Sequence, residues 1–179
     1  MITFTPESVI RSAELNANFS GLADGSEILD GAITNAKLAT GAGESGGAWT
    51  SWTPTWTGAA TSNSTVEAKY TQIGKTVIGK VSIVFAGGNK PNSTGLLFSL
   101  PVTATAAPDS NFLIGDAAFT DTGTIGYTGF VYQSTTTTAG FRVNKADSTY
   151  ATHVGITATI PHTWANTDVV ECNFIYEAA

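Results

Sequence analysis

The stretch Tyr70-Thr-Gln-Ile-Gly-Lys-Thr-Val-Ile-Gly-Lys-Val-Ser-Ile-Val-Phe85 decides the fold of this chain. Alternate residues of its second half share one face, and these are Val77, Gly79, Val81, Ile83 and Phe85. A period of two is typical of a β-strand that buries one face. Gly74-Lys75 separates this strand from the one that ends at Ile73, which predicts a tight hairpin.

Similar strands are predicted on both sides of this hairpin. In the last of them, Val170, Cys172, Phe174 and Tyr176 share a face, so Cys172 is expected to be a buried thiol. We expect strands near residues 51–57, 65–73, 76–86, 95–100, 111–119, 124–133, 140–144, 156–160 and 168–176. Short strands separated by turn signals predict a mainly β protein, with an antiparallel, jelly-roll-like β-sandwich head domain over residues 49–179.

The predicted strand over residues 124–133 carries apolar side chains on both faces. Tyr127 and Val131 lie on one face, and Phe130 and Tyr132 lie on the other. One face is expected to meet the core of the domain. The other face is either an intersubunit surface or the face of a central strand that the domain's own loops cover.

Composition excludes several classes of protein. The 179 residues carry a formal net charge of −6, and the few basic residues are scattered, so no nucleic-acid partner is expected. A single cysteine excludes a disulfide within the chain. The sequence shows neither a signal peptide nor an apolar run of the ~20 residues that span a membrane. We therefore expect synthesis in the cytoplasm, without export by the usual route and without membrane insertion.

Residues 1–25 are predicted to form an attachment segment with a short helix. Leu15, Phe19 and Leu22 fall at positions i, i+4 and i+7, which is one helical stripe. A helix of about ten residues is unstable alone, so this stripe must pack against its own domain, against copies of itself or against a larger assembly. The glycine-rich linker that follows favours the last two.

Residues 26–48 are predicted to form a short shaft and a linker. Ile28, Ile33 and Leu38 recur every five residues, a period that fits neither a helix nor a strand. Three chains wound together would bury these anchors on a shared axis, which predicts a homotrimer. Residues 41–47 are glycine-rich and mark a domain boundary.

The sequence presents no recognisable catalytic or metal-binding constellation. His153 and His162 have no cysteine or carboxylate at the usual metal-ligand spacing, and the carboxylates are spread singly. We therefore predict no catalytic residue, no metal and no cofactor, and expect that the protein is not an enzyme. Trp49, Trp52 and Trp56 are candidates for stacking on sugar rings, but their place beside the linker favours a sealing role.

Several segments, in this order along the chain, resemble phage tail-fibre and minor tail proteins. The segments are Phe4-Thr-Pro-Glu-Ser-Val-Ile-Arg-Ser-Ala-Glu-Leu-Asn-Ala-Asn-Phe-Ser-Gly-Leu22, Asp30-Gly-Ala-Ile-Thr-Asn-Ala-Lys-Leu-Ala39, Trp52-Thr-Pro-Thr-Trp56, Tyr70-Thr-Gln-Ile-Gly-Lys75 and Phe98-Ser-Leu-Pro101. The resemblance implies a homotrimeric virion protein. Its N-terminus would bind other virion proteins, and its distal β head would bind the host surface.

The resemblance leaves three functions open. The first is a structural tail-fibre or tail-tip protein that binds a host cell-surface glycan. Because the shaft is very short, the second is a capsid decoration or head-fibre protein. The third, which the sequence favours least, is a glycan-cleaving enzyme with a site formed between subunits.

The expected path of the chain places a ligand site at the end of the domain opposite the linker. If the strands run alternately up and down, loops 58–64, 87–94, 120–123 and 145–155 lie at that far end, and Trp164 lies at the near end. Their polar and aromatic side chains suit a glycan. The predicted ligand-binding residues are Asn89, Lys90, Asn92, Tyr150 and His153.

Overall fold

A computed structural model describes residues 47–92, 95–109, 112–146 and 151–179, all of which belong to the unit Ser45–Ala179. These residues form a mainly β structure that contains no helix and therefore no helix able to span a membrane. The helix predicted within residues 1–25 and nearly all of the predicted shaft lie outside the described residues. So do the proposed attachment and trimerisation residues Leu15, Phe19, Leu22, Ile28, Ile33 and Leu38.

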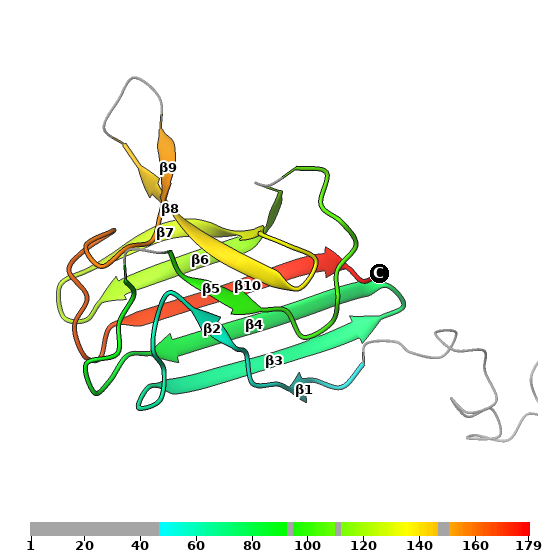
Figure 1. Cartoon of the computed structure of the whole chain (residues 1–179), viewed down its shortest axis with the longest axis horizontal. Helices are drawn as coiled ribbons and strands as arrows, with labels where there is room; N and C mark the ends of the chain where they lie inside the picture. The colour runs from blue at the N-terminus through cyan, green and yellow to red at the C-terminus, as the bar shows by residue number, and fades with distance from the viewer. Residues whose placement is uncertain (1–46, 93–94, 110–111, 147–150) are drawn as a thin grey trace, which may run out of the picture. The chain divides into compact units, whose positions relative to one another are not determined.

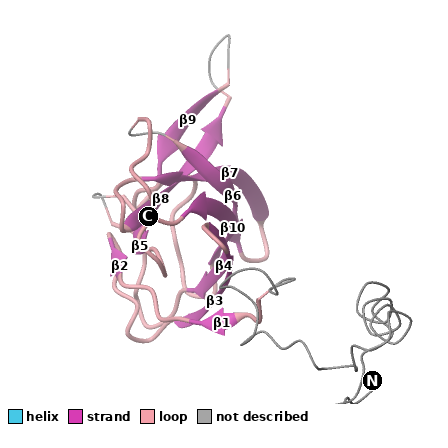
Figure 2. Ribbon diagram, turned by 90° about the vertical axis from the view of Figure 1, so that its right-hand side faces the viewer, coloured by secondary structure: helices cyan, strands magenta, loops and turns pink. Residues whose placement is uncertain are grey.

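The described strands pair in one antiparallel sheet (Figure 1). The strands are β1 (Thr50–Ser51), β2 (Trp56–Thr57), β3 (Thr65–Ile73), β4 (Thr76–Val84), β5 (Leu97–Ser99), β6 (Leu113–Asp121), β7 (Ile125–Gln133), β8 (Thr138–Lys145), β9 (Thr152–Gly155) and β10 (Val169–Glu177). Their order across the sheet is β1-β3-β4-β10-β6-β7-β8-β5-β2, and β9 pairs with β8 alone. Figure 2 shows how the sheet curls on itself like half a barrel. The predicted mainly β, antiparallel architecture is thus confirmed.

The strand predictions hold best around the hairpin. β3 and β4 meet at the predicted Gly74-Lys75 turn, where Gly74 has a φ of 59° and Ile73 pairs with Thr76. The expected strand over 51–57 is instead two short strands with different partners, because β1 pairs with β3 and β2 pairs with β5. Pro54 lies between them and has no N–H to continue a ladder.

The predicted strand over 156–160 is wrong. The chain forms β9 before this segment, and residues 157 and 160 make only an isolated bridge. The indole N–H of Trp164 donates to the carbonyl oxygens of Thr157 (2.9 Å) and Ile160 (3.2 Å), which holds this segment as a compact loop. Backbone groups that a strand would pair are therefore satisfied locally.

Aromatic side chains fill the inside of the curled sheet. Phe85, Phe98, Phe119, Phe141 and Trp164 are almost completely buried. Phe174 also lies here. Its ring occupies the space beside Gly79 on the neighbouring strand, where a side chain would overlap it. The predicted inner faces of β4 and β10 are confirmed, and Cys172 is buried, which raises the pKa of its thiol.

Two of the three clustered tryptophans seal this interior. Trp52 packs edge-on against Tyr70 and Phe174, with ring centroids 5.8 and 6.0 Å apart, and Trp56 packs against Phe98 at 5.9 Å. The predicted sealing role is confirmed for these two. Trp49 lies outside the core, with 50% of its surface exposed.

The domain has two ends, which we call the linker end and the loop end. At the linker end, the hydroxyl of Thr71 donates to the carbonyl oxygen of Gly47 at 2.7 Å. At the loop end, Val84 pairs with both Thr65 and Val169. The described parts of loops 58–64, 87–94 and 120–123 lie at the loop end, as predicted.

Trp164 also lies at the loop end, so its predicted position at the linker end is wrong. Its ring packs edge-on against Phe85, one residue beyond β4, with centroids 5.4 Å apart. The reason is that no strand crosses the domain between β9 and β10, so residues 156–168 remain at the end where β10 begins.

Candidate functional site

The outward side chains of β3, β4, β10 and β6 line a groove of about 500 Å³. Alternation along each strand separates this face from the buried one: Lys80 and Ser82 point outward on β4, and Val81 between them points into the core. We call this hollow the outer groove. Its outward residues are Glu67, Lys69, Lys80, Ser82, Asp116, Ala118, Glu171 and Asn173.

Strand register arranges these side chains in two rows across the four strands. The first row, nearer the loop end, is Glu67, Ser82, Glu171 and Ala118. The second row is Lys69, Lys80, Asn173 and Asp116. Three interstrand spacings of about 4.8 Å make each row about 14 Å long. The small Ser82 leaves the first row hollow between the carboxylates of Glu67 and Glu171, and the small Ala118 follows Glu171 on β6.

The polar groups of the outer groove are not used by the fold. Among the described residues, no side-chain hydrogen bond or ion pair involves any of these groups. Other polar side chains form hydrogen bonds within the fold. The amide of Gln133, for example, donates to the carbonyl oxygen of Thr105 at 2.6 Å. The hydrogen-bonding capacity of the groove is thus free for a ligand.

Trp49 provides a flat aromatic surface beside the groove. The ammonium nitrogen of Lys80 lies 5.3 Å from the centroid of the Trp49 ring, which is a cation–π contact. Amide, hydroxyl, carboxylate and ammonium groups on rigid strands, next to an exposed indole, suit a ligand with many hydroxyl groups. The sequence showed these carboxylates as isolated residues, because only the strand register brings Glu67, Asp116 and Glu171 together.

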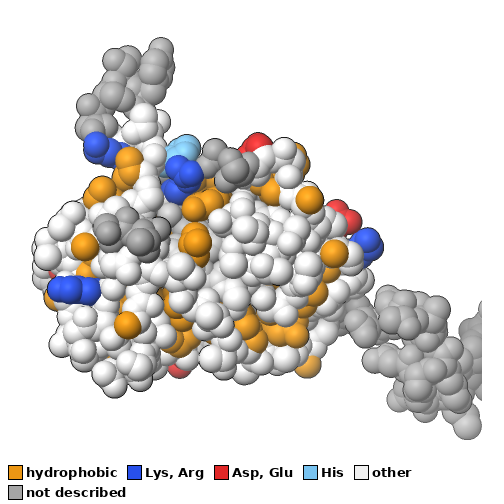
Figure 3. Space-filling model, in the orientation of Figure 1, with side chains coloured by type: hydrophobic (Ala, Val, Ile, Leu, Met, Phe, Trp, Pro, Cys, Tyr) orange, Lys and Arg blue, Asp and Glu red, His pale blue; other side chains and the backbone are white. Residues whose placement is uncertain are grey.

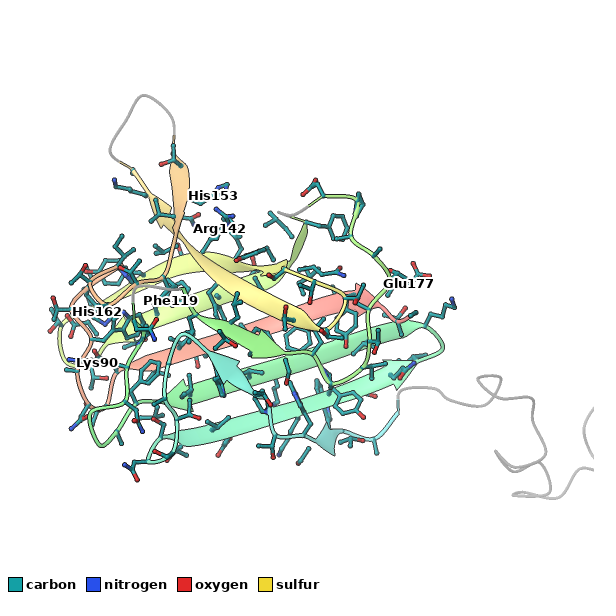
Figure 4. All side chains as sticks on the ribbon, in the orientation of Figure 1. Lys90, Phe119, Arg142, His153, His162 and Glu177 are labelled. Carbon is teal, nitrogen blue, oxygen red and sulfur yellow. The ribbon has the colours of Figure 1, made fainter. Side chains whose placement is uncertain are left out.

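The predicted ligand-binding residues lie elsewhere and do not line the outer groove. Asn89 and Lys90 lie at the loop end; the backbone N–H of Asn89 donates to Ala86 O at 3.1 Å, and that of Asn92 donates to Gly58 O at 2.7 Å. His153 lies on β9, and Figure 4 shows it well apart from Lys90. Tyr150 is outside the described residues.

His153 belongs to a different surface, formed by the outer faces of β7, β8 and β9. Its ring meets Phe130 edge-on at 4.9 Å, and the guanidinium of Arg142 lies 4.8 Å from the centroid of Tyr132. Figure 3 shows histidine and basic side chains close together at the base of the projecting β8–β9 ribbon. Phe130 and Tyr132 are half-buried by these neighbours, so the second apolar face of β7 is partly covered within the chain.

A buried polar cluster at the loop end was missed by sequence reasoning. The Nε2 atom of His162 lies 3.1 Å from Asp168 Oδ2, and both side chains are buried. The backbone N–H groups of Thr122 (3.0 Å) and Ala165 (2.7 Å) also donate to the Asp168 carboxylate. Asp168 thereby joins the β6–β7 turn to the loop before β10.

This cluster also has the donor set of a metal site. Within the described residues, ligand atoms of Asp121, His162 and Asp168 all lie within 4.8 Å of one another. The contacts of Asp168, however, are structural, since two backbone N–H groups and the His162 ring already occupy its carboxylate. The six-residue spacing of His162 and Asp168 was the available sequence signal, but it is not a specific one.

Comparisons with known proteins identify no relative. No protein-family model, no curated protein and no solved structure matches this chain. Arguments about function therefore depend on the residues themselves and on the geometry of the outer groove.

Proposed function

We propose that this chain is a structural virion protein, a trimeric phage tail-fibre or tail-tip protein, whose β domain binds a host cell-surface glycan. The order of the segments between Phe4 and Pro101 that resemble such proteins supports the virion assignment. The glycan binds in the outer groove, rather than at the predicted loop-end residues.

The observation that carries glycan binding is the array of unused polar side chains in the outer groove. Protein side chains that lack partners are ordinarily solvated on a convex surface, but these line a hollow next to the exposed ring of Trp49. Sugars combine hydroxyl groups with flat C–H faces, so they use both features of such a surface. Strands fix the backbone positions of these residues, so binding has to order the side chains alone.

The sandwich-like form of the head is part of the same proposal. Phe98 on β5 and Phe174 on β10 approach each other across the interior, with ring centroids 5.6 Å apart. This contact across the interior supports a sandwich-like head, in which two layers pack face to face.

Binding of the purified full-length chain to host cell walls tests the proposal. We expect sedimentation with the walls, and competition by soluble wall glycans. Trp49→Ala and Glu171→Gln should each reduce this binding at least ten-fold. Glu177→Gln is the matched control, because Glu177 is also exposed on β10 but lies outside the groove.

Two results would contradict the proposal. Wild-type protein that does not sediment with the walls excludes glycan binding, and unchanged binding by both variants excludes the outer groove as the site. Gold-labelled antibody on intact virions tests the location: label on the capsid would identify a decoration or head-fibre protein, and label on the tail is the expected result.

A further inference from the structure

We propose that the outer groove selects glycans that carry an anionic group, a carboxylate or a phosphate, and that this group binds between Lys69 and Lys80. The inference deepens the proposed function and rests on it. It names the chemical class of the ligand and the two side chains that recognise it.

The register of β3 and β4 forces the two lysines together. Lys69 pairs directly with Lys80, and both side chains are exposed on the outer face. Like charges directly opposite each other on neighbouring strands destabilise a sheet. The arrangement therefore carries an electrostatic cost that the fold itself does not require.

Nothing in the described part of the chain offsets this cost with an ion pair. Glu67, Asp116 and Glu171 share the groove, but neither lysine lies within salt-bridge distance of any described carboxylate. The ammonium of Lys80 contacts the ring of Trp49 instead. A ligand anion seated between the two ammonium groups would supply the missing countercharge.

The other polar side chains of the groove determine the orientation of the bound ligand. In the same row, Asn173 and Asp116 follow Lys80 on β10 and β6, and Glu171 lies in the next row on β10. The amide both donates and accepts hydrogen bonds, and the carboxylates accept them from hydroxyl groups. An acidic sugar would thus place its anion over β3 and β4, and its hydroxyl groups over β10 and β6. In the first row, the carboxylate of Glu67 lies opposite Ser82 and disfavours an anion in that row.

Titration of the full-length chain, followed through the indole N–H resonance of Trp49 by NMR, tests this inference. The probes are glucuronate, inorganic phosphate and neutral glucose, at low salt. We expect the resonance to shift with one or both anions, and at least ten-fold less with glucose. Higher salt should weaken the response, because a partly exposed ion pair is screened. A shift with glucuronate alone indicates a uronic acid, and a shift with phosphate alone indicates a phosphorylated glycan.

Lysine variants show whether the anion lies where we propose. Lys69→Ala and Lys80→Ala should each weaken the anion response at least five-fold. Lys75→Ala is the control, since Lys75 is an exposed lysine in the β3–β4 turn and does not line the groove. A wild-type resonance that responds to neither anion, or an anion response that persists in both groove variants, overturns the inference. Cell-wall binding by the same protein would then still support the proposed function, which separates the two failures.

Discussion

The inner and outer faces of β3, β4, β10 and β6 differ sharply, although they belong to the same strands. Inside, Val81 and Phe174 are almost completely buried in an aromatic core. Outside, the side chains of their sequence neighbours Lys80 and Asn173 line a polar groove and make no hydrogen bond with another described residue. One strand can therefore supply stability and binding chemistry separately, because successive side chains point to opposite faces.

Phe174→Ala should have the largest effect on the inner face. The ring packs near Trp52, Phe98 and Tyr176, so its loss leaves a cavity between both sides of the curled sheet. We expect the free energy of unfolding to fall by about 3–5 kcal/mol, as measured by urea denaturation. A loss below about 1 kcal/mol would mean that the inner face does not provide the stability we assign to it.

Gly79→Ala tests the same face by adding an atom instead of removing a ring. A β-carbon at this position would overlap the Phe174 ring, so we expect a loss of about 1–3 kcal/mol in the same assay. Gly126→Ala is the control, because a β-carbon there meets no atom within 4 Å. Equal effects of the two substitutions would contradict the close packing of β4 on β10.

Alkaline pH should lower the stability of the fold through ionisation of Tyr176, whose side chain lies on the inner face. Burial raises the pKa of this phenol from its ordinary value of 10.0 to about 12, and its hydroxyl donates to Val102 O at 2.7 Å. A raised pKa means that the folded state favours the neutral phenol. Its contribution to stability is complete below pH 10 and is lost as the pH rises to 12. Tyr176→Phe should show a smaller fall in melting temperature across that range, and an unchanged fall would exclude Tyr176 as the cause.

The smallest effect is expected on the outer face, and it has the opposite sign. Lys69→Thr removes the like charge opposite Lys80, so the free energy of unfolding should rise by about 0.2–1 kcal/mol. The gain should shrink in high salt. Lys75→Thr, in the turn, serves as the comparison. Destabilisation by Lys69→Thr would show that the lysine pair supports the fold. It would contradict our assignment of stability to the inner face alone.

Local sequence pattern predicted the elements of this fold far better than their arrangement. Alternation of apolar residues located β3, β4 and β10 to within about two residues, and it identified Cys172 as a core residue. Sequence period is a local property and follows from the order of residues within one strand. Apart from the β3–β4 hairpin, it did not show which strands are neighbours, since the other pairings depend on contacts between distant segments.

The candidate site was hidden for the same reason. Lys69, Glu171 and Asp116 become neighbours only through pairings across β3, β4, β10 and β6. The buried pair of His162 and Asp168 was missed because the two side chains meet only through the fold of the loop before β10, which local sequence does not show. Residues 156–160 were predicted as a strand, whereas the hydrogen bonds of the Trp164 indole hold them as a loop.

The position of β10 bears on how the protein is made by the ribosome. β10 is the last described strand, yet it lies in the middle of the sheet, where it pairs with β4 on one side and with β6 on the other. During synthesis, the β3–β4 hairpin and the β6–β7–β8 meander emerge first and have no shared partner. These two parts of the sheet become connected only when β10, residues 169–177, has left the ribosome. A nascent chain that stops before Val169 therefore exposes two unpaired edges, and such edges are what cellular quality control and aggregation act upon.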